Sequence, residues 1–554
     1  MAESKENLQM EKIVSLCKRR GFIFQSSEIY GGINGFWDYG PLGAELKRNV
    51  KELWWNSMMR QREDVAGLEA TIIMSPAIWK ASGHVDTFSD PMCDCKKCKK
   101  RHRADQLCDD QGLALTKDAN GKFVLPAGTK CTNCGSAELT EPRPFNLMFK
   151  TYVGPVESED SIAYLRPETA QAIFAQFQNV MVTARQKVPF GIGQIGKAFR
   201  NEVTPRNYTF RSREFEQMEL EYFIKPDEAI EAIHGAVVTV PETGHPGEPK
   251  PNWGWQAWHQ YWVEERVRFY EGIGLARDTL GFHRQTPVEL AHYARACVDI
   301  LFKFPFSKRD ENGELKGEEL EGIAARSDFD LSQHQRFSGK PMTVFDEELR
   351  TAWKKLPKEK QDDLWRRYYD NRKRYLTKMA KPEDQPEQIQ QQATADAEAF
   401  AKGNYVPHVI EPSAGVDRLI LALIANAYSE TTETDDKGKR ETIYVMKFHP
   451  RVAPIKVGVL PLLKNKPELV KKALAVRDLL RPWMNVFYDE SGSIGKRYAR
   501  QDEGGTPFCV TIDFDTLGEK PELLDTVTLR YRDDGRQERL KISELLEFLL
   551  SKVR

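Results

Sequence analysis

The chain has 554 residues, enough for several domains, and 81 Lys and Arg side chains nearly balance 82 Asp and Glu. A net charge of −1 excludes a strong overall attraction to nucleic acid, so such a partner would need local basic patches. The longest apolar run, residues 419–427, is too short to span a bilayer, and the first residues carry no signal-peptide pattern. Nine cysteines, six of them from Cys93 to Cys134, favour a reducing compartment, so we expect a cytoplasmic protein that does not bind membranes.

A glycine-rich loop followed by a helix is predicted near the N-terminus, over residues 31–60. The glycines and Asn34 favour tight turns, and Pro41 suits the first turn of a helix. Apolar residues then recur at spacings of three and four, which is typical of a helix with one broad buried face. Those residues are Leu42, Leu46, Val50, Leu53, Trp54 and Met58. Packing in the core is sufficient to explain them.

Two Cys-x-x-Cys pairs, Cys95 with Cys98 and Cys131 with Cys134, bracket a short segment. Four thiolates can supply all the ligands of a tetrahedral zinc ion. A small insertion without a core of its own needs such a cross-link for stability. We therefore expect residues 88–142 to form an insertion held by structural zinc, with free thiols in a loop as the alternative. A catalytic zinc is disfavoured because four cysteines leave no open position on the metal.

Two charged residues before the central strands have ordinary explanations. Arg103 ends a basic run that begins at Lys99, and such runs are usually solvated. Glu168 stands in the first turn of a helix that Pro167 can open, where an acid complements the helix dipole.

Residues 197–223 read KAFRNEVTPRNYTFRSREFEQMELEYF and end in a pattern of period two. A strand with this pattern has two faces, one with Phe215, Gln217, Glu219 and Glu221 and the other with Met218, Leu220 and Tyr222. An Arg fork suits a phosphate and a Phe ring suits a purine. Carboxylates suit an ammonium group or a metal-bound triphosphate. The residues alone predict a site for a nucleotide and a cationic small molecule; an exposed hairpin without ligand is the alternative.

The glycines just before this segment match a dinucleotide-binding pattern, Gly191-x-Gly193-x-x-Gly196. Pro205 follows within a few residues, where that pattern requires a helix, and Ala198 stands where a phosphate loop has Ser or Thr. We predict a buried strand instead.

Further parts of the N-terminal 450 residues have patterns that predict secondary structure, in differing detail. Residues 225–317 are predicted to be an insertion with a packed tryptophan-rich helix, and residues 317–331 alternate like a strand beside an acidic pocket. Residues 340–402 predict long charged helices, either an arm facing nucleic acid or a solvated insertion. Residues 408–425 predict a strand, a glycine turn and an apolar helix that carries Arg418 near its start.

From about residue 451 the composition changes to alternating β and α patterns, which predict a small α/β domain. Helices are expected at 467–480 and 542–550 and strands at 485–488, 507–512 and 526–532. Lys496, Arg497 and Arg500 are candidate contacts to RNA.

Three of these segments resemble the motifs of the class II aminoacyl-tRNA synthetases: residues 31–60 resemble motif 1, 197–223 motif 2 and 408–425 motif 3. The strings LRPETAQ and FRNEVTPRNYTFRSREFEQMELEYF resemble the glycine-specific synthetases in particular. The resemblance implies an α+β fold, with an antiparallel β-sheet catalytic core flanked by helices in residues 1–450. It implies an α/β anticodon-binding domain in residues 451–554, and a homodimer formed through motif 1.

The activity that the resemblance implies is the attachment of glycine to its cognate tRNA(Gly), with ATP and Mg²⁺ as substrate and cofactor. Glycyl-adenylate forms with release of pyrophosphate, and the glycyl group then passes to the terminal ribose hydroxyl of the tRNA. Alternatives are a sister synthetase for proline, threonine or serine, or an inactive synthetase-like RNA-binding protein. Intact Arg200, Glu202, Phe215 and Arg418 argue against an inactive protein.

The resemblance also carries residue roles onto matching positions. Catalytic roles fall on Arg200, Glu202 and Arg418. The ATP contacts implied are Arg200, Asn201, Glu202, Phe210, Arg211, Ser212, Arg213, Glu214, Phe215, Glu319, Leu320, Gly415, Val416, Asp417 and Arg418. The glycine contacts implied are Arg103, Glu168, Phe215, Glu216, Gln217, Met218, Glu219, Glu411, Pro412, Ser413, Ala414 and Gly415. Glu319 is also a candidate to hold magnesium on the triphosphate.

Overall fold

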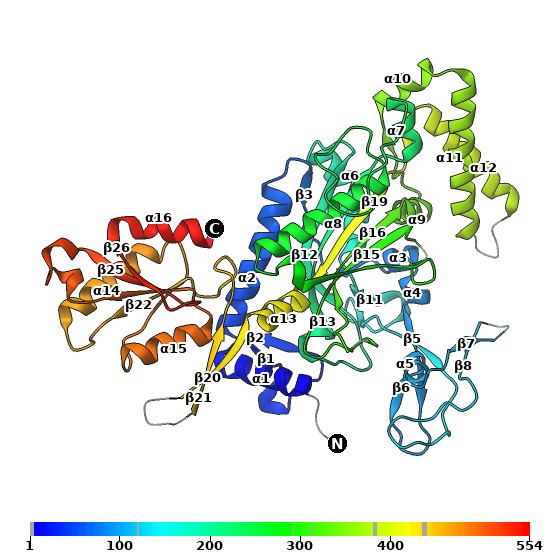
Figure 1. The fold of residues 1–554 in the computed structure, drawn as a ribbon. Helices are drawn as coiled ribbons and strands as arrows, with labels where there is room; N and C mark the ends of the chain where they lie inside the picture. The colour runs from blue at the N-terminus through cyan, green and yellow to red at the C-terminus, as the bar shows by residue number, and fades with distance from the viewer. Residues whose placement is uncertain (1–4, 119–120, 292, 312, 380–384, 435–439) are drawn as a thin grey trace.

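The computed structural model of the chain describes residues 5–118, 121–291, 293–311, 313–379, 385–434 and 440–554. Figure 1 shows a central body built on a β-sheet. A cysteine-containing lobe and a helical arm project from one side of the body, and a C-terminal domain lies on the other side. This arrangement confirms the predicted α+β class, with an antiparallel core and a separate C-terminal α/β unit.

A seven-stranded sheet organises the body, and all its pairings are antiparallel except the one between its last two strands. In spatial order the strands are β14 (Leu280–Arg284), β15 (Ala296–Phe302), β16 (Glu318–Ser327), β19 (His408–Gly415), β13 (Glu214–Ile224), β12 (Phe190–Phe199) and β3 (Val65–Gly67). The segments at 197–223 and 408–425 therefore meet in the middle of the sheet, where Glu219 pairs with Ser413 across the two strands.

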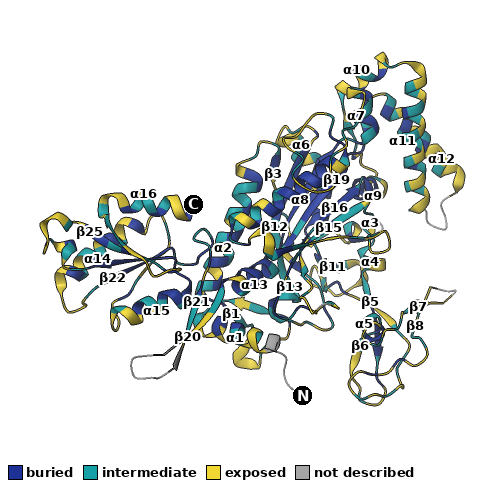
Figure 2. Cartoon of the chain, viewed as in Figure 1, coloured by how far each residue is buried: buried dark blue, intermediate teal, exposed yellow. Residues whose placement is uncertain are grey.

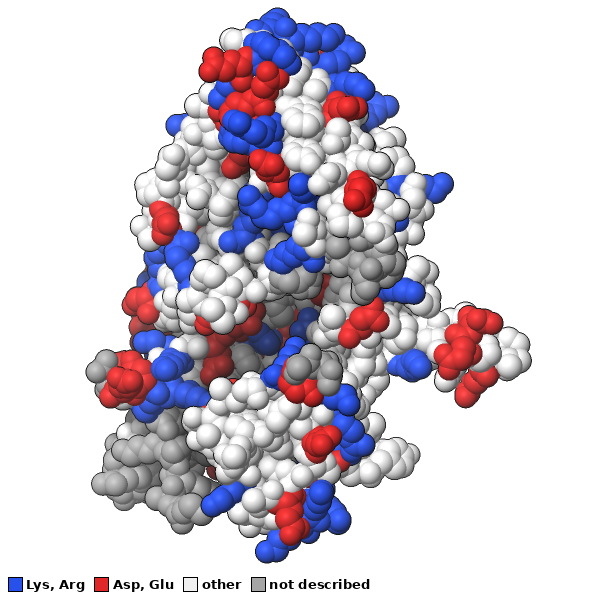
Figure 3. Space-filling view, turned by 90° about the vertical axis from the view of Figure 1, so that its right-hand side faces the viewer, with Lys and Arg blue, Asp and Glu red and all other residues white. Residues whose placement is uncertain are grey.

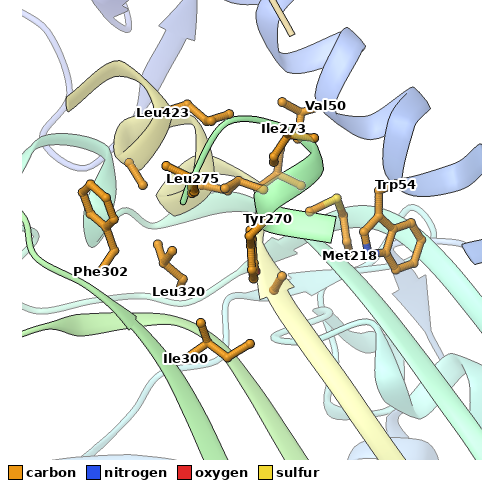
Figure 4. Packing of buried hydrophobic residues seen from close by; sticks show 14 of the residues in the cluster. Val50, Trp54, Met218, Tyr270, Ile273, Leu275, Ile300, Phe302, Leu320 and Leu423 are labelled. Carbon is orange, nitrogen blue, oxygen red and sulfur yellow. The ribbon is translucent and has the colours of Figure 1, made fainter. Parts of the chain in front are cut away.

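Three helices cover one face of this sheet: α2 (Pro41–Trp55), α8 (Trp255–Gly272) and α13 (Val416–Ala427). Helix α2 begins at Pro41, as predicted, because a proline at the first helical position loses no hydrogen bond. In Figure 4, Met218 of β13 lies beside Trp54 of α2, and both side chains are buried. The apolar half of the period-two pattern thus faces these helices.

Helices α6 (Ala170–Thr183) and α9 (Phe329–Ser338) pack against the opposite face, where Phe174 and Phe177 meet Phe223. Figure 2 shows the central strands buried between the two helical layers. The polar half of the pattern in β13 faces this second layer, so its carboxylates are enclosed by protein.

Residues 225–317, predicted to be an insertion, instead supply part of the body. Helix α8 and strands β14 and β15 come from this segment, and β15 pairs with β16 along its length. Trp258 and Trp262 are buried in the core, as their helical spacing indicated. The sequence failed here because the pairing of β15 with β16 is a long-range contact that leaves no local pattern.

The glycines at 191–196 belong to strand β12, as predicted, and not to a phosphate loop. A Cβ at Gly193 would approach the Met59 Cε atom to 1.9 Å, and one at Gly196 would approach the Arg166 Nη2 atom to 2.1 Å. A side chain at either position would therefore have to displace the packed end of Met59 or Arg166.

Two units project beside the sheet. The cysteine lobe contains β5 (Ser89–Asp94), β6 (Arg101–Arg103), α5 (Ala104–Asp109), β7 (Thr116–Lys117), β8 (Phe123–Val124) and β9 (Arg143–Asn146). The arm contains α10 (Glu347–Lys355), α11 (Lys358–Lys378) and α12 (Pro386–Ala401). On the face seen in Figure 3, basic and acidic side chains mix at the top, over the arm. That mixture gives no uniformly basic stripe on this face.

The C-terminal domain has a five-stranded sheet with strand order β23-β22-β24-β25-β26. Its elements are β22 (Val457–Pro461), α14 (Pro467–Leu480), β23 (Val486–Tyr488), α15 (Ile494–Gly504), β24 (Phe508–Ile512), β25 (Thr526–Tyr531), β26 (Gln537–Lys541) and α16 (Ile542–Val553). They match the predicted pattern closely. Arg497 is not an RNA contact as predicted, because its buried guanidinium donates to the carbonyls of Pro461 and Leu462.

Shorter elements complete the chain. They are α1 (Lys5–Arg20), β1 (Ile23–Gln25), β2 (Trp37–Tyr39), β4 (Ile73–Met74), α3 (Pro76–Ala81), α4 (His84–Thr87), β10 (Lys150–Tyr152), β11 (Ile162–Leu165), α7 (Asp227–His234), β17 (Val344–Phe345), β18 (Asn404–Tyr405), β20 (Tyr428–Thr434) and β21 (Arg440–Met446). Each helix in the described ranges is too short or too polar to cross a membrane.

Candidate active site

A cleft lies where β13, β16 and β19 meet the loop between β12 and β13. The cleft is partly open to solvent, and the empty space between its walls, open solvent included, is about 720 Å³. The lining residues are Arg200, Glu202, Thr209, Phe210, Arg211, Ser212, Phe215, Gln217, Glu319, Leu320, Ser413, Gly415, Asp417 and Arg418. The structure thus brings most of the predicted nucleotide contacts together.

Arg200 stands at the edge of the cleft with its guanidinium held between two aromatic rings. Its central carbon lies 5.4 Å from the ring centroid of Phe215 and 5.4 Å from that of Phe88. Its Nε donates a hydrogen bond to the Pro167 carbonyl at 3.0 Å. These contacts orient the guanidinium before any ligand arrives, which suits an arginine that must meet a phosphate.

Arg418 also lines the cleft, at the start of α13. Its guanidinium lies 4.7 Å from the ring centroid of Phe210, and its Nη1 is 3.2 Å from the Glu319 carboxylate. The two charged side chains are 32% and 49% exposed. An ion pair this exposed contributes little stability, so a phosphate can take the place of Glu319 at low cost.

Glu202 and Arg211 form a second pair in the cleft, with the Arg211 Nε 3.0 Å from the Glu202 carboxylate. Glu319 is the acid best placed for magnesium, because it is half exposed at the cleft and offers the oxygen ligands that Mg²⁺ prefers. The residues present therefore fit a metal-bound triphosphate.

The inner end of the cleft reaches Gln217 and Ser413, and directly behind them lies Glu219. Its carboxylate accepts hydrogen bonds from Gln217 at 2.9 Å, from Ser413 at 2.7 Å, and from both the backbone N–H and the hydroxyl of Thr169. Four donors and no acceptor are the surroundings of an ionised carboxylate. Burial and the neighbouring Glu168 nevertheless raise the pKa of Glu219.

Glu168 is buried beside Glu219, on the loop before α6. Burial opposes its ionisation, but the His84 imidazole, 3.3 Å away, together with Arg326 and Gln171, holds the pKa of Glu168 well below its usual range. Gln171 adds a hydrogen bond to the Glu168 carboxylate at 3.0 Å. Glu168 is therefore a fixed negative charge in this part of the site.

Glu411 and Asp330 share the buried guanidinium of Arg326. The Arg326 Nη1 donates to both oxygens of Glu411, at 2.9 and 2.7 Å, and its Nε donates to Asp330 at 2.8 Å. The guanidinium also stacks on Tyr293, 3.9 Å from the ring centroid. Burial raises the pKa of Glu411 despite these bonds.

Glu221 completes the cluster and differs from the other acids. Its side chain is fully buried, and neither carboxylate oxygen finds a hydrogen-bond partner among the residues that the structure describes. Burial and the charge of Glu411 raise the pKa of Glu221 well above its usual range.

These five carboxylates form what we call the acid cluster: Glu168, Glu219, Glu221, Glu411 and Asp330. Among the described residues, Arg326 is the permanent cation paired with these acids, and the His84 ring contacts Glu168. The cluster therefore has more acids than cations, and its unbalanced charge favours a small ammonium group at the inner end of the cleft.

Several predicted glycine contacts lie on the wrong face of the sheet. The side chain of Met218 is buried in the core against α2, and Ala414 belongs to the same apolar cluster, as does Val416, which was a predicted ATP contact. Pro412 alternates with Glu411 and Ser413 along β19 and so faces away from them. The side chains of these residues cannot contact a ligand in the cleft.

Other predicted contacts have structural partners outside the cleft. Glu216 pairs with Lys47 at 3.2 Å and with Lys51 at 2.9 Å, both on α2. Glu214 pairs with Lys197. These acids therefore fix α2 and the edge of the hairpin.

Arg213, Asn201, Arg103 and Asp417 also have partners in the protein. Arg213 donates to the carbonyls of Glu202 and Asn34, and the Asn201 N–H donates to the Leu147 carbonyl. Arg103 pairs with Asp90 at 3.1 Å and with Asp105, and is not among the residues lining the cleft. Asp417 lines the cleft but accepts hydrogen bonds from Tyr39 and Lys47, at 2.6 and 2.8 Å.

The four predicted cysteine ligands come together in the lobe. Their sulfur atoms all lie within 4.8 Å of one another, with Cys95 to Cys134 at 3.6 Å and Cys98 to Cys131 at 3.7 Å. Four sulfurs bound at ~2.3 Å in a tetrahedron are about 3.8 Å apart, so this donor set fits a tetrahedral metal. The His102 Nε2 lies 3.2 Å from the Cys131 sulfur, outside the four.

Sequence analysis missed the residues that surround the acids. Arg326 had a signal, since it follows the apolar run 322–325 at the end of β16 and precedes Asp330 by four residues. The contacts of His84 with Glu168 and of Thr169 with Glu219 had none, because each joins segments remote in sequence.

Comparison with known proteins gives matches over nearly the whole chain. Residues 152–243 match the family described as tRNA synthetase class II core domain (G, H, P, S and T), and residues 456–552 match the family described as anticodon binding domain. Proteins named glycine--tRNA ligase are similar to this chain. The one from Thermobifida fusca is 41% identical over 98% of each chain, and the one from Thermus thermophilus is 42% identical over 98% of this chain and 99% of its own. The one from Treponema denticola is 41% identical over 99% of this chain and 98% of its own.

Proposed function

The chain belongs to the glycine--tRNA ligases, a family of class II aminoacyl-tRNA synthetases, and on that premise we propose that its cleft is where glycine reacts with ATP. The enzyme attaches glycine to tRNA in two steps. Glycyl-adenylate forms with release of pyrophosphate, and the glycyl group then passes to the tRNA. ATP and Mg²⁺ are the substrate and cofactor that class II synthetases use.

One observation supports this use of the cleft above the others: its two ends carry opposite charge. Arg200, Arg211 and Arg418 line the outer part, whereas the acid cluster lies behind the inner end at Gln217 and Ser413. Phosphates of ATP would contact the arginines, with the adenine against Phe215. The ammonium of glycine would sit against Glu219.

The chemistry asks for positioning and charge stabilisation from the protein. The glycine carboxylate is already ionised, so its oxygen attacks the α-phosphorus without a protein base. A new O–P bond forms as the bond from the α-phosphorus to the bridging oxygen breaks, and pyrophosphate leaves with the electron pair. Arg200 stabilises the charge on the α-phosphate, and Arg418 holds the γ-phosphate. Magnesium, held on the triphosphate with Glu319, would neutralise the charge of the leaving group.

Selection of glycine would come from the tight enclosure of the ammonium. Gln217, Ser413 and Thr169 all bond to Glu219, so the wall around this carboxylate is tied together by hydrogen bonds. A side chain on the substrate would have to displace atoms of this wall. A clash of this kind rejects alanine more strongly than a pocket can prefer a larger residue by contact.

Exchange of labelled pyrophosphate into ATP, measured with each amino acid in turn, tests the proposal. We expect exchange with glycine and much weaker exchange with alanine, serine, proline and threonine. Exchange with proline, threonine or serine in preference to glycine would identify a sister synthetase. No exchange with any amino acid, from enzyme that still binds tRNA, would favour an inactive RNA-binding protein.

We also propose a homodimer formed through residues 31–60 and the loop before them. Ile29 and Tyr30 are each 88% exposed and Ile33 is 50% exposed, an apolar group that a second copy would cover. Sedimentation should show a dimer for the native chain. Replacing Ile29 and Tyr30 with aspartate should shift it to monomer; an active native monomer would overturn this proposal.

The remaining assignments follow from the same family. We propose residues 1–450 as the catalytic unit and 451–554 as the unit that binds the anticodon of tRNA(Gly), in a cytoplasmic enzyme. We propose structural zinc on Cys95, Cys98, Cys131 and Cys134. Metal analysis of protein purified without chelator should find zinc at about one ion per chain, and Cys98→Ser should lose it; a zinc-free native chain would contradict the assignment.

A further inference from the structure

The acid cluster contains one member with no hydrogen-bond donor among the described residues. Glu219 accepts four hydrogen bonds, and Glu411 accepts two from Arg326. Glu168 contacts His84 and Gln171, and Asp330 contacts Arg326 and Gln171. Glu221 accepts none, although its side chain is fully buried. A buried carboxylate without partners is costly, whereas the neutral acid is tolerated.

The groups around Glu221 come from three other elements as well as from its own strand. Glu219 precedes it on β13, Glu411 faces it from β19, Arg326 from β16 and Asp330 from α9. The single cation in this set, Arg326, already donates to Glu411 and Asp330. Before ligand binding, Glu221 therefore meets a surplus of negative charge.

We propose that Glu221 carries a proton in the ligand-free enzyme and that binding of the substrate ammonium expels it. A cation that enters beside Glu219 compensates one more negative charge in the cluster and so stabilises the ionised form of Glu221. The O–H bond of the acid breaks, its electron pair stays on the carboxylate, and the proton passes to solvent. Binding of the amino acid and release of one proton are then a single linked event.

This inference rests on the proposed function, because it requires an ammonium at the inner end of the cleft. Glu221 does not contact the substrate in it; it is a positioning residue that adjusts the charge of the pocket to the occupied state. Linkage fixes the sign of the pH effect. Affinity for an ammonium ligand should rise with pH as the ligand-free enzyme loses the proton by itself, and should level off above that range. Burial and the charge of Glu411 raise the pKa of Glu221. The pH range of this effect therefore lies above the usual pKa of a glutamic acid.

Calorimetry with two ligands tests whether proton release requires the ammonium group of the ligand. One ligand is a sulfamoyl analogue of glycyl-adenylate, and the other is the same compound without its amino group. The binding enthalpy of each ligand is measured at neutral pH in buffers with different ionisation enthalpies. The slope of the binding enthalpy against the ionisation enthalpy of the buffer gives the number of protons released. We expect about one proton per site for the ammonium ligand and none for the other.

Glu221→Gln provides the decisive variant, because the amide has the shape of the neutral acid and no proton to release. It should still bind the ligand without the amino group as the native enzyme does, which shows that it is folded. Its proton release with the ammonium ligand should vanish. Glu411→Gln serves as the comparison, since the inference assigns the proton to Glu221 and not to its neighbour.

Three results would overturn the inference: no release from the native enzyme, equal release with both ligands, or release that persists in Glu221→Gln and disappears in Glu411→Gln. Failure of the proposed function looks different, because then neither analogue binds in the cleft at all.

Discussion

The two ends of the cleft both depend on charged side chains, but they differ in contact with solvent. At the nucleotide end, Arg418 is 32% and Glu319 49% exposed, and their pairing is a weak surface contact. At the amino-acid end, Glu219 is 2% exposed and Glu221 fully buried. The exposed end can exchange its internal partners for phosphates at little cost. The buried end holds unbalanced negative charge that a cation must satisfy. The nucleotide end of the cleft thus offers a large anion exposed arginines whose partners it can replace. The amino-acid end offers a small cation buried carboxylates that stay in place.

The largest effect should follow from removing the preorganised arginine at the nucleotide end. Arg200→Ala should lower kcat for glycine-dependent pyrophosphate exchange by about 100- to 1,000-fold, as expected for the loss of one oriented donor to the transition state. Lys197→Ala is the matched control, because Lys197 lies three residues before Arg200, near the end of β12, and pairs with Glu214 outside the cleft. A change of only a few-fold in Arg200→Ala would contradict its assignment.

A smaller effect, confined to the amino acid, should follow from neutralising the buried end. Glu219→Gln removes the charge that faces the ammonium and should raise KM for glycine by about 10- to 150-fold, the cost of a charged hydrogen bond of ~1.5–3 kcal/mol. KM for ATP should stay close to its native value. Equal increases in both constants would mean that the two ends are not separate sites.

The smallest effect should come from salt. Raising the ionic strength should increase KM for ATP by a few-fold, because exposed arginines are screened within a Debye length of ~10 Å. KM for glycine should change less, because the carboxylates that meet its ammonium are buried. Potassium glutamate in place of chloride controls for binding of the anion itself. A stronger salt effect on glycine than on ATP would reverse the comparison.

The sequence predicted the central features of the site because they depend on local patterns. The alternation from Phe215 to Tyr222 correctly separated the cleft face from the core face, and the glycine turn placed Arg418 at the start of α13. The elements of the C-terminal domain were predicted closely for the same reason. Ligand contacts assigned to consecutive residues of a family motif were less accurate, because Met218 and Ala414 alternate with cleft residues and point into the core.

What the sequence did not reveal depends on contacts between distant segments. Strand β15 joins the sheet through its pairing with β16, and residues 225–317 therefore belong to the body. His84 reaches Glu168 across 84 positions, and Arg326 reaches Glu411 across 85. No periodicity records such pairings, yet they set the charge of the amino-acid end.

A crystal structure of the enzyme with the sulfamoyl analogue of glycyl-adenylate would test the central claim most directly. We expect the sulfamoyl group, which replaces the α-phosphate, within hydrogen-bond distance of the Arg200 guanidinium. We expect the adenine against Phe215 and the ammonium beside Glu219. An ammonium in the arginine-lined outer part, with the acid cluster still without a cation, would contradict the account.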